Sequence, residues 1–310
     1  MRIGNFETGV RARIKTRLDA AAADYMRDGV LTQIDFSQPA GEAALTGPDS
    51  VSWRIFKNPV SLFIGGVTAV LLEFAEPRVR SGVWDHSVFK TEPVKRLKRT
   101  GLAAMVTVYG AQSVAERMIA GVRRMHDRVA GVTPDGTPYA ANDEELLNWV
   151  QATASFGFLE AYNAYVSPLT TEEKDQFYRD ATRSAALYGA EGAPVSDAAR
   201  HEFFDQMTPK LEPSDIVFEF IQIMRAAPAL PQPAQIGQRV LIRGAVDLLP
   251  SEIRETLGLG PRFGLRPFEG TLLRRMGARA DRIPLPSSPP GQACLRLGLP
   301  ADYLYKRRMQ

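Results

Sequence analysis

The stretch SVAERMIAGVRRMHDRVAG, residues 113–131, carries the pattern that decides the fold of this chain. Apolar side chains and one histidine recur in it at positions i, i+3, i+7 and i+10: Ile119, Val122, His126 and Val129. That spacing places them on one face of an α-helix. Similar spacing extends through most of the 310 residues, and no stretch has convincing strand alternation. The sequence therefore predicts an all-α fold.

Helices are predicted over most of the chain. The expected ranges are 8–28, 60–75, 93–109, 113–131, 143–166, 170–188, 196–208, 214–226, 236–248 and 251–257. Ser113 with Glu116, and Asn142 with Glu145, have the spacing of a helix capping box. Gly, Pro and Arg accumulate after residue 258. We predict a single domain over residues 1–310, with a core at about 50–260 and an irregular C-terminal extension at 261–310.

The composition is that of a globular protein, 45% hydrophobic and 24% charged. The single cysteine, Cys294, excludes an internal disulfide and a cysteine-based metal cluster. The N-terminus lacks the apolar core of a signal peptide. The longest apolar run, residues 60–75, falls short of the ~20 residues that a membrane-spanning helix needs. We therefore expect a cytoplasmic protein without a transmembrane segment.

Positive charge is concentrated in one segment. The formal net charge is only +3, too small to indicate nucleic-acid binding. Residues 90–128, however, contain nine Lys or Arg and three acidic residues. The segment is either a solvated basic face or a local site for carboxylates or phosphates.

His126 is the strongest candidate for a cofactor ligand. It lies in line with an apolar stripe, and Arg123, Arg124 and Arg128 flank it. An imidazole facing an apolar space, with cations at its rim, suits an iron porphyrin and its propionates. A histidine on an apolar helix face is, however, more often a hydrogen-bonded core residue than a ligand. Periodicity alone leaves both interpretations open.

A second candidate cluster precedes it. Arg96, Arg99 and Thr100 are spaced at i, i+3 and i+4, so they share a helix face. Two guanidiniums and a hydroxyl suit a carboxylate, although a surface basic helix has the same spacing.

Two carboxylates end the most apolar predicted helix. Glu73 and Glu76 are costly there unless they are paired, so either could handle protons in a pocket or simply pair with Arg78 or Arg80. The sequence has no HExxH zinc motif, Walker loop, dinucleotide fingerprint or GxSxG motif.

An ordered set of motifs resembles the DUF2236 family, which contains the MpaB oxygenase and the latex-clearing protein, a rubber oxygenase. The blocks are GGVTA (65–69), LLEFAEP (71–77), GVWDHS (82–87), RLKRT (96–100), VRRMHDRVAG (122–131), PDGTPYAA (134–141), LLNWVQAT (146–153) and LLP (248–250). The resemblance covers roughly residues 60–260.

The resemblance implies an all-α, globin-like core that binds haem b. It places the proximal iron ligand at His126, and it places Arg96, Arg99 and Thr100 at the haem. Arg99 stands where the family has a lysine that can approach the iron, and guanidinium is a poor ligand at neutral pH. A propionate or substrate contact is therefore the better expectation for Arg99.

Two further departures concern histidines. Glu76 replaces a family histidine, and we hypothesise that it acts as a distal base. Gln151 replaces another, which removes a competing ligand from the long helix. The implied function is oxygenation, or peroxide-driven oxidation, of a small apolar organic substrate with O2 or peroxide. The alternatives are a non-catalytic haem sensor or carrier and a helical protein that has lost its haem.

Overall fold

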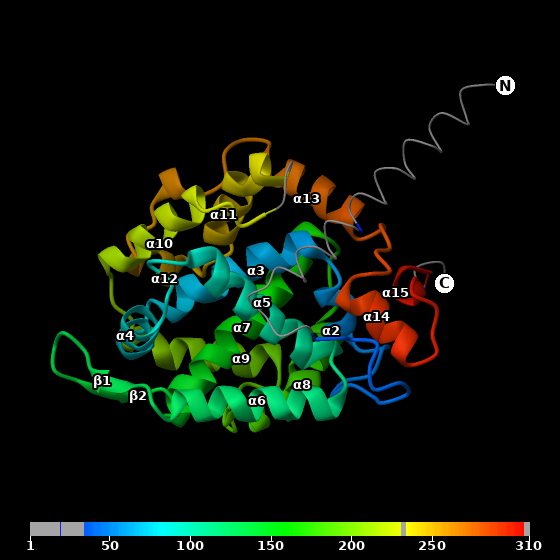
Figure 1. Cartoon of the computed structure of the whole chain (residues 1–310). Coiled ribbons are helices and arrows are strands. Elements are labelled where there is room, and N and C mark those ends of the chain that lie inside the picture. Colours follow the sequence, from blue (N-terminus) through cyan, green and yellow to red (C-terminus); the bar gives the residue numbers. More distant parts are fainter. Residues whose placement is uncertain (1–18, 20–33, 231–233, 307–310) are drawn as a thin grey trace.

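The computed structural model describes residue 19, residues 34–230 and residues 234–306 (Figure 1). The helix expected over residues 8–28 lies outside these residues, except for Asp19. The described part is predominantly helical and forms one domain, so the all-α prediction is confirmed. The helices are α2 (Val51–Phe56), α3 (Pro59–Glu73), α4 (Pro77–His86), α5 (Pro93–Tyr109), α6 (Gln112–His126), α7 (Glu144–Tyr165), α8 (Thr171–Tyr188), α9 (Asp197–Met207), α10 (Asp215–Ala226), α11 (Gln238–Asp247), α12 (Ser251–Thr256), α13 (Glu269–Ala280), α14 (Pro289–Arg296) and α15 (Tyr303–Lys306).

The centre of the fold is the helix pair α3 and α7. Gly65 and Gly157 let the two backbones meet, since a Cβ on Gly65 would lie 2.7 Å from the Gly157 carbonyl oxygen. Ile64, Leu71 and Leu72 of α3 are fully buried. The contact explains why the apolar run near residues 60–75 belongs to the core. No helix of the described part is by itself long and apolar enough to cross a membrane; the bent pair α3–α4 passes on length and composition only.

Side chains cap the starts of several helices, but two of the predicted caps differ from the structure. The Asn58 side chain accepts from the Val60 and Ser61 amides at the start of α3, and Thr170 with Glu173 forms a capping box at α8. The capping boxes predicted at Ser113 and Asn142 are wrong.

At α6 the cap is Ala111, without a side-chain bond, and the Ser113 amide donates to Glu42 instead. At α7 the cap is Asp143, one residue later than predicted. At α7 the side chain next to the predicted cap, Asp143, accepts the first free amides of the helix. At α6 a side chain far away in the sequence, Glu42, accepts the Ser113 amide.

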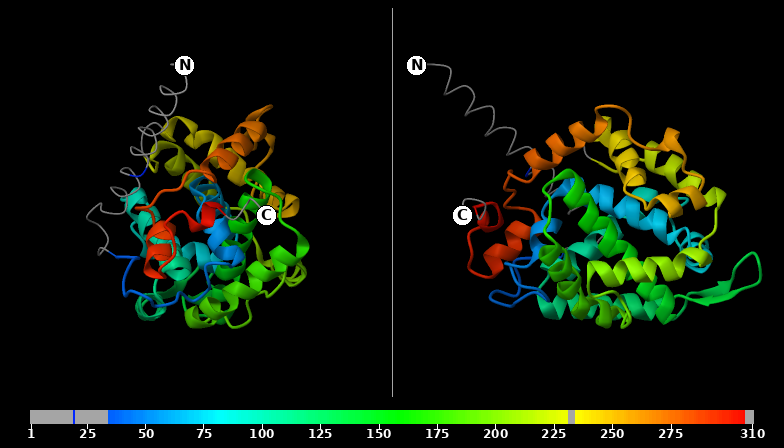
Figure 2. Two further views of the ribbon diagram at one scale, coloured as in Figure 1. Left: turned by 90° about the vertical axis from the view of Figure 1, so that its right-hand side faces the viewer. Right: turned by 180° about the vertical axis from the view of Figure 1, so that it is seen from behind.

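One short sheet was not predicted. β1 (Ala130–Val132) and β2 (Pro138–Ala140) pair antiparallel, with Gly131 opposite Tyr139, and the hairpin projects from the helical body (Figures 1 and 2). Residues 133–137 form its loop, where Gly136 takes φ +94°. Three-residue strands are too short to show alternation in the sequence.

The C-terminal part is more ordered than expected. It was predicted to be irregular after residue 260, yet α13, α14 and α15 form there. The α13 helix packs on α3 and α7, and the Lys57 ammonium lies 3.3 Å from Asp281 in a buried ion pair. Pro289 and Pro290 do not break α14, because they occupy its first turn.

Candidate functional site

The helices α5 and α6 pack against each other and carry the main candidate residues. Arg96, Arg99 and Thr100 lie in the first half of α5. His126 is the last residue of α6, and Asp127 is its C-cap. The imidazole therefore lies at the end of a helix whose apolar face, including Ala115 and Ile119, is buried.

The His126 ring is partly buried, and its Nδ1 atom is buried without a hydrogen-bond partner among the described residues. Removal from water lowers the pKa of His126, and the nearby Arg96 cation lowers it further. The imidazole is consequently neutral at neutral pH.

The other two histidines are accounted for by local contacts. His86 Nε2 lies 3.2 Å from the Tyr139 hydroxyl, and His201 Nδ1 lies 2.9 Å from the Asp197 carbonyl oxygen.

Asn142 is a site residue that the sequence predicted in another role, as a helix cap. Its side-chain amide donates to Asp127 Oδ1 at 2.6 Å and to the Arg123 carbonyl oxygen at 3.2 Å. These bonds orient the amide, and its Oδ1 is buried without a partner in the described part of the chain. The Asn142 side chain approaches His126 closely enough to oppose the lowering of its pKa, although the pair does not complete a hydrogen bond by geometry.

Glu73, the last residue of α3, also belongs to this group. Its side chain lies deep in the protein with part of its surface still accessible. Burial raises the pKa of Glu73 to about 7, and the Arg96 cation opposes the rise. Burial also lowers the pKa of Arg96, against the attraction of Glu73. Arg96 thus lies within electrostatic range of both Glu73 and His126.

Thr100 and Arg99 lie at the outside of this group, and both are exposed. The Thr100 hydroxyl donates to the Arg96 carbonyl oxygen at 3.0 Å and accepts a bond from the Arg96 guanidinium. Arg99 is close enough to Arg96 to contribute to the lowering of its pKa. The structure therefore groups the three α5 residues as the spacing predicts.

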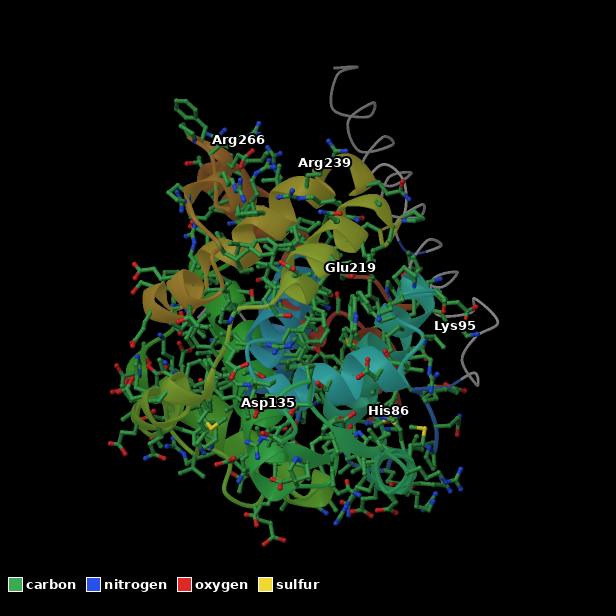
Figure 3. All side chains as sticks on the ribbon, turned by 90° about the vertical axis from the view of Figure 1, so that its left-hand side faces the viewer. His86, Lys95, Asp135, Glu219, Arg239 and Arg266 are labelled. Atoms are coloured by element: carbon green, nitrogen blue, oxygen red, sulfur yellow. The ribbon has the colours of Figure 1, made fainter. Side chains whose placement is uncertain are left out.

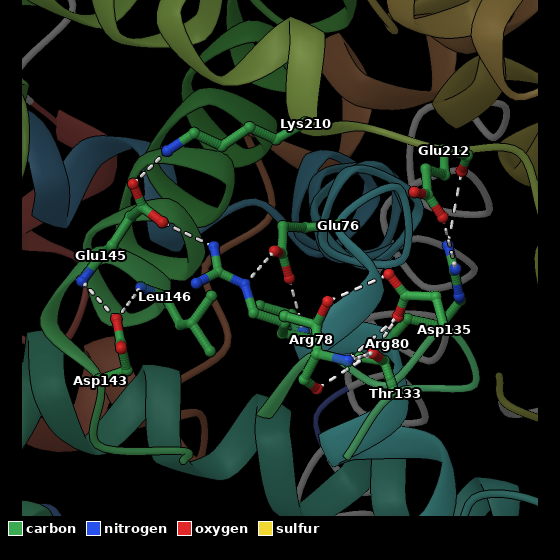
Figure 4. A network of polar contacts seen from close by, with 12 residues as sticks. Glu76, Arg78, Arg80, Thr133, Asp135, Asp143, Glu145, Leu146, Lys210 and Glu212 are labelled. Atoms are coloured by element: carbon green, nitrogen blue, oxygen red, sulfur yellow. Dashed lines mark hydrogen bonds and ion pairs between the residues drawn. The ribbon is translucent and has the colours of Figure 1, made fainter. Parts of the chain in front are cut away.

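Glu76 lies in a different network (Figure 4). It is the N-cap of α4, where Oε2 accepts from the Val79 amide at 2.7 Å. Its Oε1 accepts from Arg78 Nε at 2.6 Å, and Arg78 also binds Glu145. With its side chain 2% exposed and both oxygens engaged, Glu76 has the paired role that the sequence left open.

The network around Glu76 borders a surface cavity of about 330 Å³. The remaining polar residues that line it are Arg78, Asp135, Thr137, Glu145, Lys210 and Glu212. Four carboxylates face two cations in this lining, and both cations, Arg78 and Lys210, pair with Glu145.

Arg123 is exposed, and its guanidinium lies beside Gly189 at the C-terminal end of α8. A cation there complements the helix dipole. Its backbone carbonyl, by contrast, reaches the site through Asn142. Within residues 34–230 and 234–306 no three His, Cys, Asp or Glu side chains gather in a way that could hold a metal ion.

The chain was compared with known proteins. The family model described as ER-bound oxygenase mpaB/B'/Rubber oxygenase, catalytic domain, matches residues 53–280. No curated protein and no solved structure matches. The match includes α3, α5, α6 and α7, and with them Glu73, Arg96, His126 and Asn142. It supports an oxygenase-type enzyme, and because it spans well over half of the chain, this protein belongs to the mpaB/rubber oxygenase catalytic-domain family.

Proposed function

We propose that this protein is a haem b-dependent oxygenase or peroxide-driven oxidase that acts on a small apolar organic substrate, with His126 as the axial ligand of the iron. The observation that carries the proposal is the buried Nδ1 of His126, which has no hydrogen-bond partner among the described residues although the Asn142 side chain lies close enough to affect the pKa of the imidazole. Buried polar atoms are rarely left unsatisfied without a functional reason.

The residues present fit a haem ligand. In metal-binding histidines one ring nitrogen usually donates to an oxygen, which fixes the tautomer and leaves the other nitrogen for the metal. A hydrogen bond from Nδ1 to Asn142 Oδ1 would leave Nε2 to bind the iron. Asp127 and the Arg123 carbonyl hold the amide in that orientation.

A single histidine suits a porphyrin better than a bare ion. Structural and catalytic metal sites built by protein side chains need three or four ligands, and the described residues offer no such group. A porphyrin brings four nitrogens of its own, so it needs one axial side chain from the protein.

Arg96 would supply a positive charge at the site, and Glu73 would transfer a proton. When bound, the haem supplies the oxidation chemistry. The Arg96 cation would bind a propionate or hold the Glu73 carboxylate, and Arg99 and Thr100 would contact the exposed edge of the haem. Glu73, with a pKa of about 7, could give or take a proton at its carboxyl oxygen near neutral pH.

This assignment favours Glu73 over Glu76 as the proton-handling carboxylate, because the oxygens of Glu76 are engaged by Arg78 and the Val79 amide. It also favours an enzyme over a haem sensor or carrier, since a carrier has no use for a carboxyl group poised to ionise at neutral pH.

The test is the visible spectrum of the full chain purified after haem supplementation. We expect a Soret band that is lost or shifted in His126→Ala and retained in the matched controls His86→Ala and His201→Ala. A colourless wild type would refute haem binding, and an unchanged spectrum in His126→Ala would refute the ligand. Peroxide-dependent oxidation of a chromogenic phenol would separate the enzyme from the carrier; we expect it to fall in Glu73→Gln with the Soret band intact.

A further inference from the structure

Phe268 is the most exposed large apolar side chain among the described residues, at 89%. It is also their only non-glycine residue with positive φ, at 69°. A left-handed backbone is uncommon for a bulky residue, and such strain concentrates at functional positions. The backbone thus takes an unfavourable conformation while holding an aromatic ring in water.

The surrounding structure fixes this conformation. Phe268 is the N-cap of α13. The Glu269 carboxylate accepts from the Arg266 amide at 2.9 Å and forms a two-point ion pair with Arg243 of α11. Both partners of that pair are largely buried. Because α11 anchors the turn, Phe268 is presented by a rigid element rather than by a loose loop.

A second apolar side chain lies beside it. Leu272 is one helical turn further along α13, its amide donates to the Phe268 carbonyl oxygen at 3.0 Å, and it is 46% exposed. The two side chains therefore make a small apolar tip at the start of α13.

Exposed arginines are frequent in the sequence on both sides of this tip. Arg262, Arg266, Arg274 and Arg275 are all exposed. Figure 3 places Arg239 and Arg266 at the same end of the molecule. Burial lowers the pKa of Arg225, and the neighbouring cations Arg243, Arg239 and Arg266 lower it further. Residues 225–282 hold ten arginines against five acidic residues, so this end is strongly basic.

Two of these arginines line a cavity. Arg225 and Arg239, with Gln238 and residues Ala226–Pro228, border a hollow of about 360 Å³ between the end of α10 and the start of α11. Arg225 also stacks on the Phe263 ring, with 5.9 Å from guanidinium to ring centroid. Within residues 34–230 and 234–306 no carboxylate forms an ion pair with the two arginines that line the cavity, Arg225 and Arg239. The cavity therefore presents uncompensated positive charge of a kind that suits a phosphate.

We propose that this end of the molecule docks on a membrane surface that contains anionic lipids. Phe268 and Leu272 insert among the acyl chains, the exposed arginines meet the negative headgroups, and the Arg225–Arg239 cavity receives a lipid phosphate. An apolar tip within a basic ring matches the two layers of such a surface. A second copy of this chain fits less well, because a symmetric contact would place the same arginines against one another. The proposal is independent of haem binding.

The experiment is co-sedimentation of the full chain with phosphatidylcholine vesicles, with and without phosphatidylserine. We expect binding only when phosphatidylserine is present, and weaker binding at high salt because exposed charges are screened. Phe268→Ser should weaken partitioning about tenfold, the effect of losing one buried aromatic ring. Arg266→Gln should weaken it about fivefold, as expected for one basic residue near an anionic surface.

Matched controls are available on other elements. Val132 is 62% exposed on the hairpin, and Arg179 is exposed on α8. Val132→Ser and Arg179→Gln should leave partitioning unchanged. Equal binding to neutral and anionic vesicles would overturn the proposal, as would equal losses in Phe268→Ser and Val132→Ser. Self-association of the wild type that Phe268→Ser abolishes would assign the tip to a second copy instead.

Discussion

Glu73 at the end of α3 and Arg96 on α5 perturb each other's ionisation. The attraction does not overcome burial, since the pKa of Glu73 still rises to about 7 and that of Arg96 still falls. Arg96 thus lies within electrostatic range of both a carboxyl group that ionises near neutral pH and the candidate haem ligand His126.

Glu73 makes the stability of the haem-free protein depend on pH. Its folded pKa lies above the unfolded value of 4.5, so the folded state binds more protons between about pH 4.5 and 7, and stability falls as pH rises through that window. The cost above pH 7 is up to about 3 kcal/mol. Glu73→Gln should remove this slope. Urea unfolding at pH 5 and pH 8 measures it, and equal slopes in both proteins would contradict the assignment.

Substitutions at the neighbours Asn142 and Asp143 should have different effects, the first on haem binding and the second on stability. Asn142→Ala removes the oxygen that faces His126, so haem affinity should fall about tenfold or more and the Soret band should shift. Asp143→Ala removes the α7 cap, so stability should fall by about 1 kcal/mol with the spectrum unchanged. Haem titration and urea unfolding of both variants give the comparison. Lower stability with unchanged haem affinity in Asn142→Ala would show that Asn142 has a purely structural role.

Adjacent glycines in α3 should respond in opposite directions. Gly65→Ala places a methyl group against the backbone of α7, which cannot move aside, and should destabilise the protein by about 3 kcal/mol. Gly66→Ala has its nearest neighbour, the Phe158 ring, at 3.9 Å and should stabilise the helix by about 0.5–1 kcal/mol. Thermal unfolding distinguishes them. Similar effects would mean that the α3–α7 contact is looser than described.

Glu76 should contribute to stability rather than to oxidation. Glu76→Ala removes the α4 cap and one partner of Arg78, so unfolding free energy should fall by about 1–3 kcal/mol. The control Glu212→Ala removes an exposed partner of Arg80, 3.8 Å away, and should cost less than about 0.5 kcal/mol. The haem spectrum should not change in either. Lost turnover with unchanged stability in Glu76→Ala would support the distal-base hypothesis instead.

Local patterns in the sequence predicted most of the helices and the family. The spacing of Ile119, Val122 and His126 identifies α6, and the ordered motifs identify the mpaB/rubber oxygenase domain. The same patterns misplaced two caps, at Ser113 and Asn142, because the side chain that satisfies an amide need not be the one with standard spacing.

The sequence by itself determined the helical class and the pairing of Arg96 with Thr100, because both depend on contacts one helical turn apart. Only the tertiary structure decided which carboxylate lies near Arg96. Glu73 and Glu76 are three residues apart, yet the end of α3 directs one toward α5 while the start of α4 commits the other to Arg78 and the Val79 amide. Burial and electrostatic environment depend on elements that meet across the fold, so the approach of Asn142 to His126 and the pKa of Glu73 are set by packing rather than by spacing.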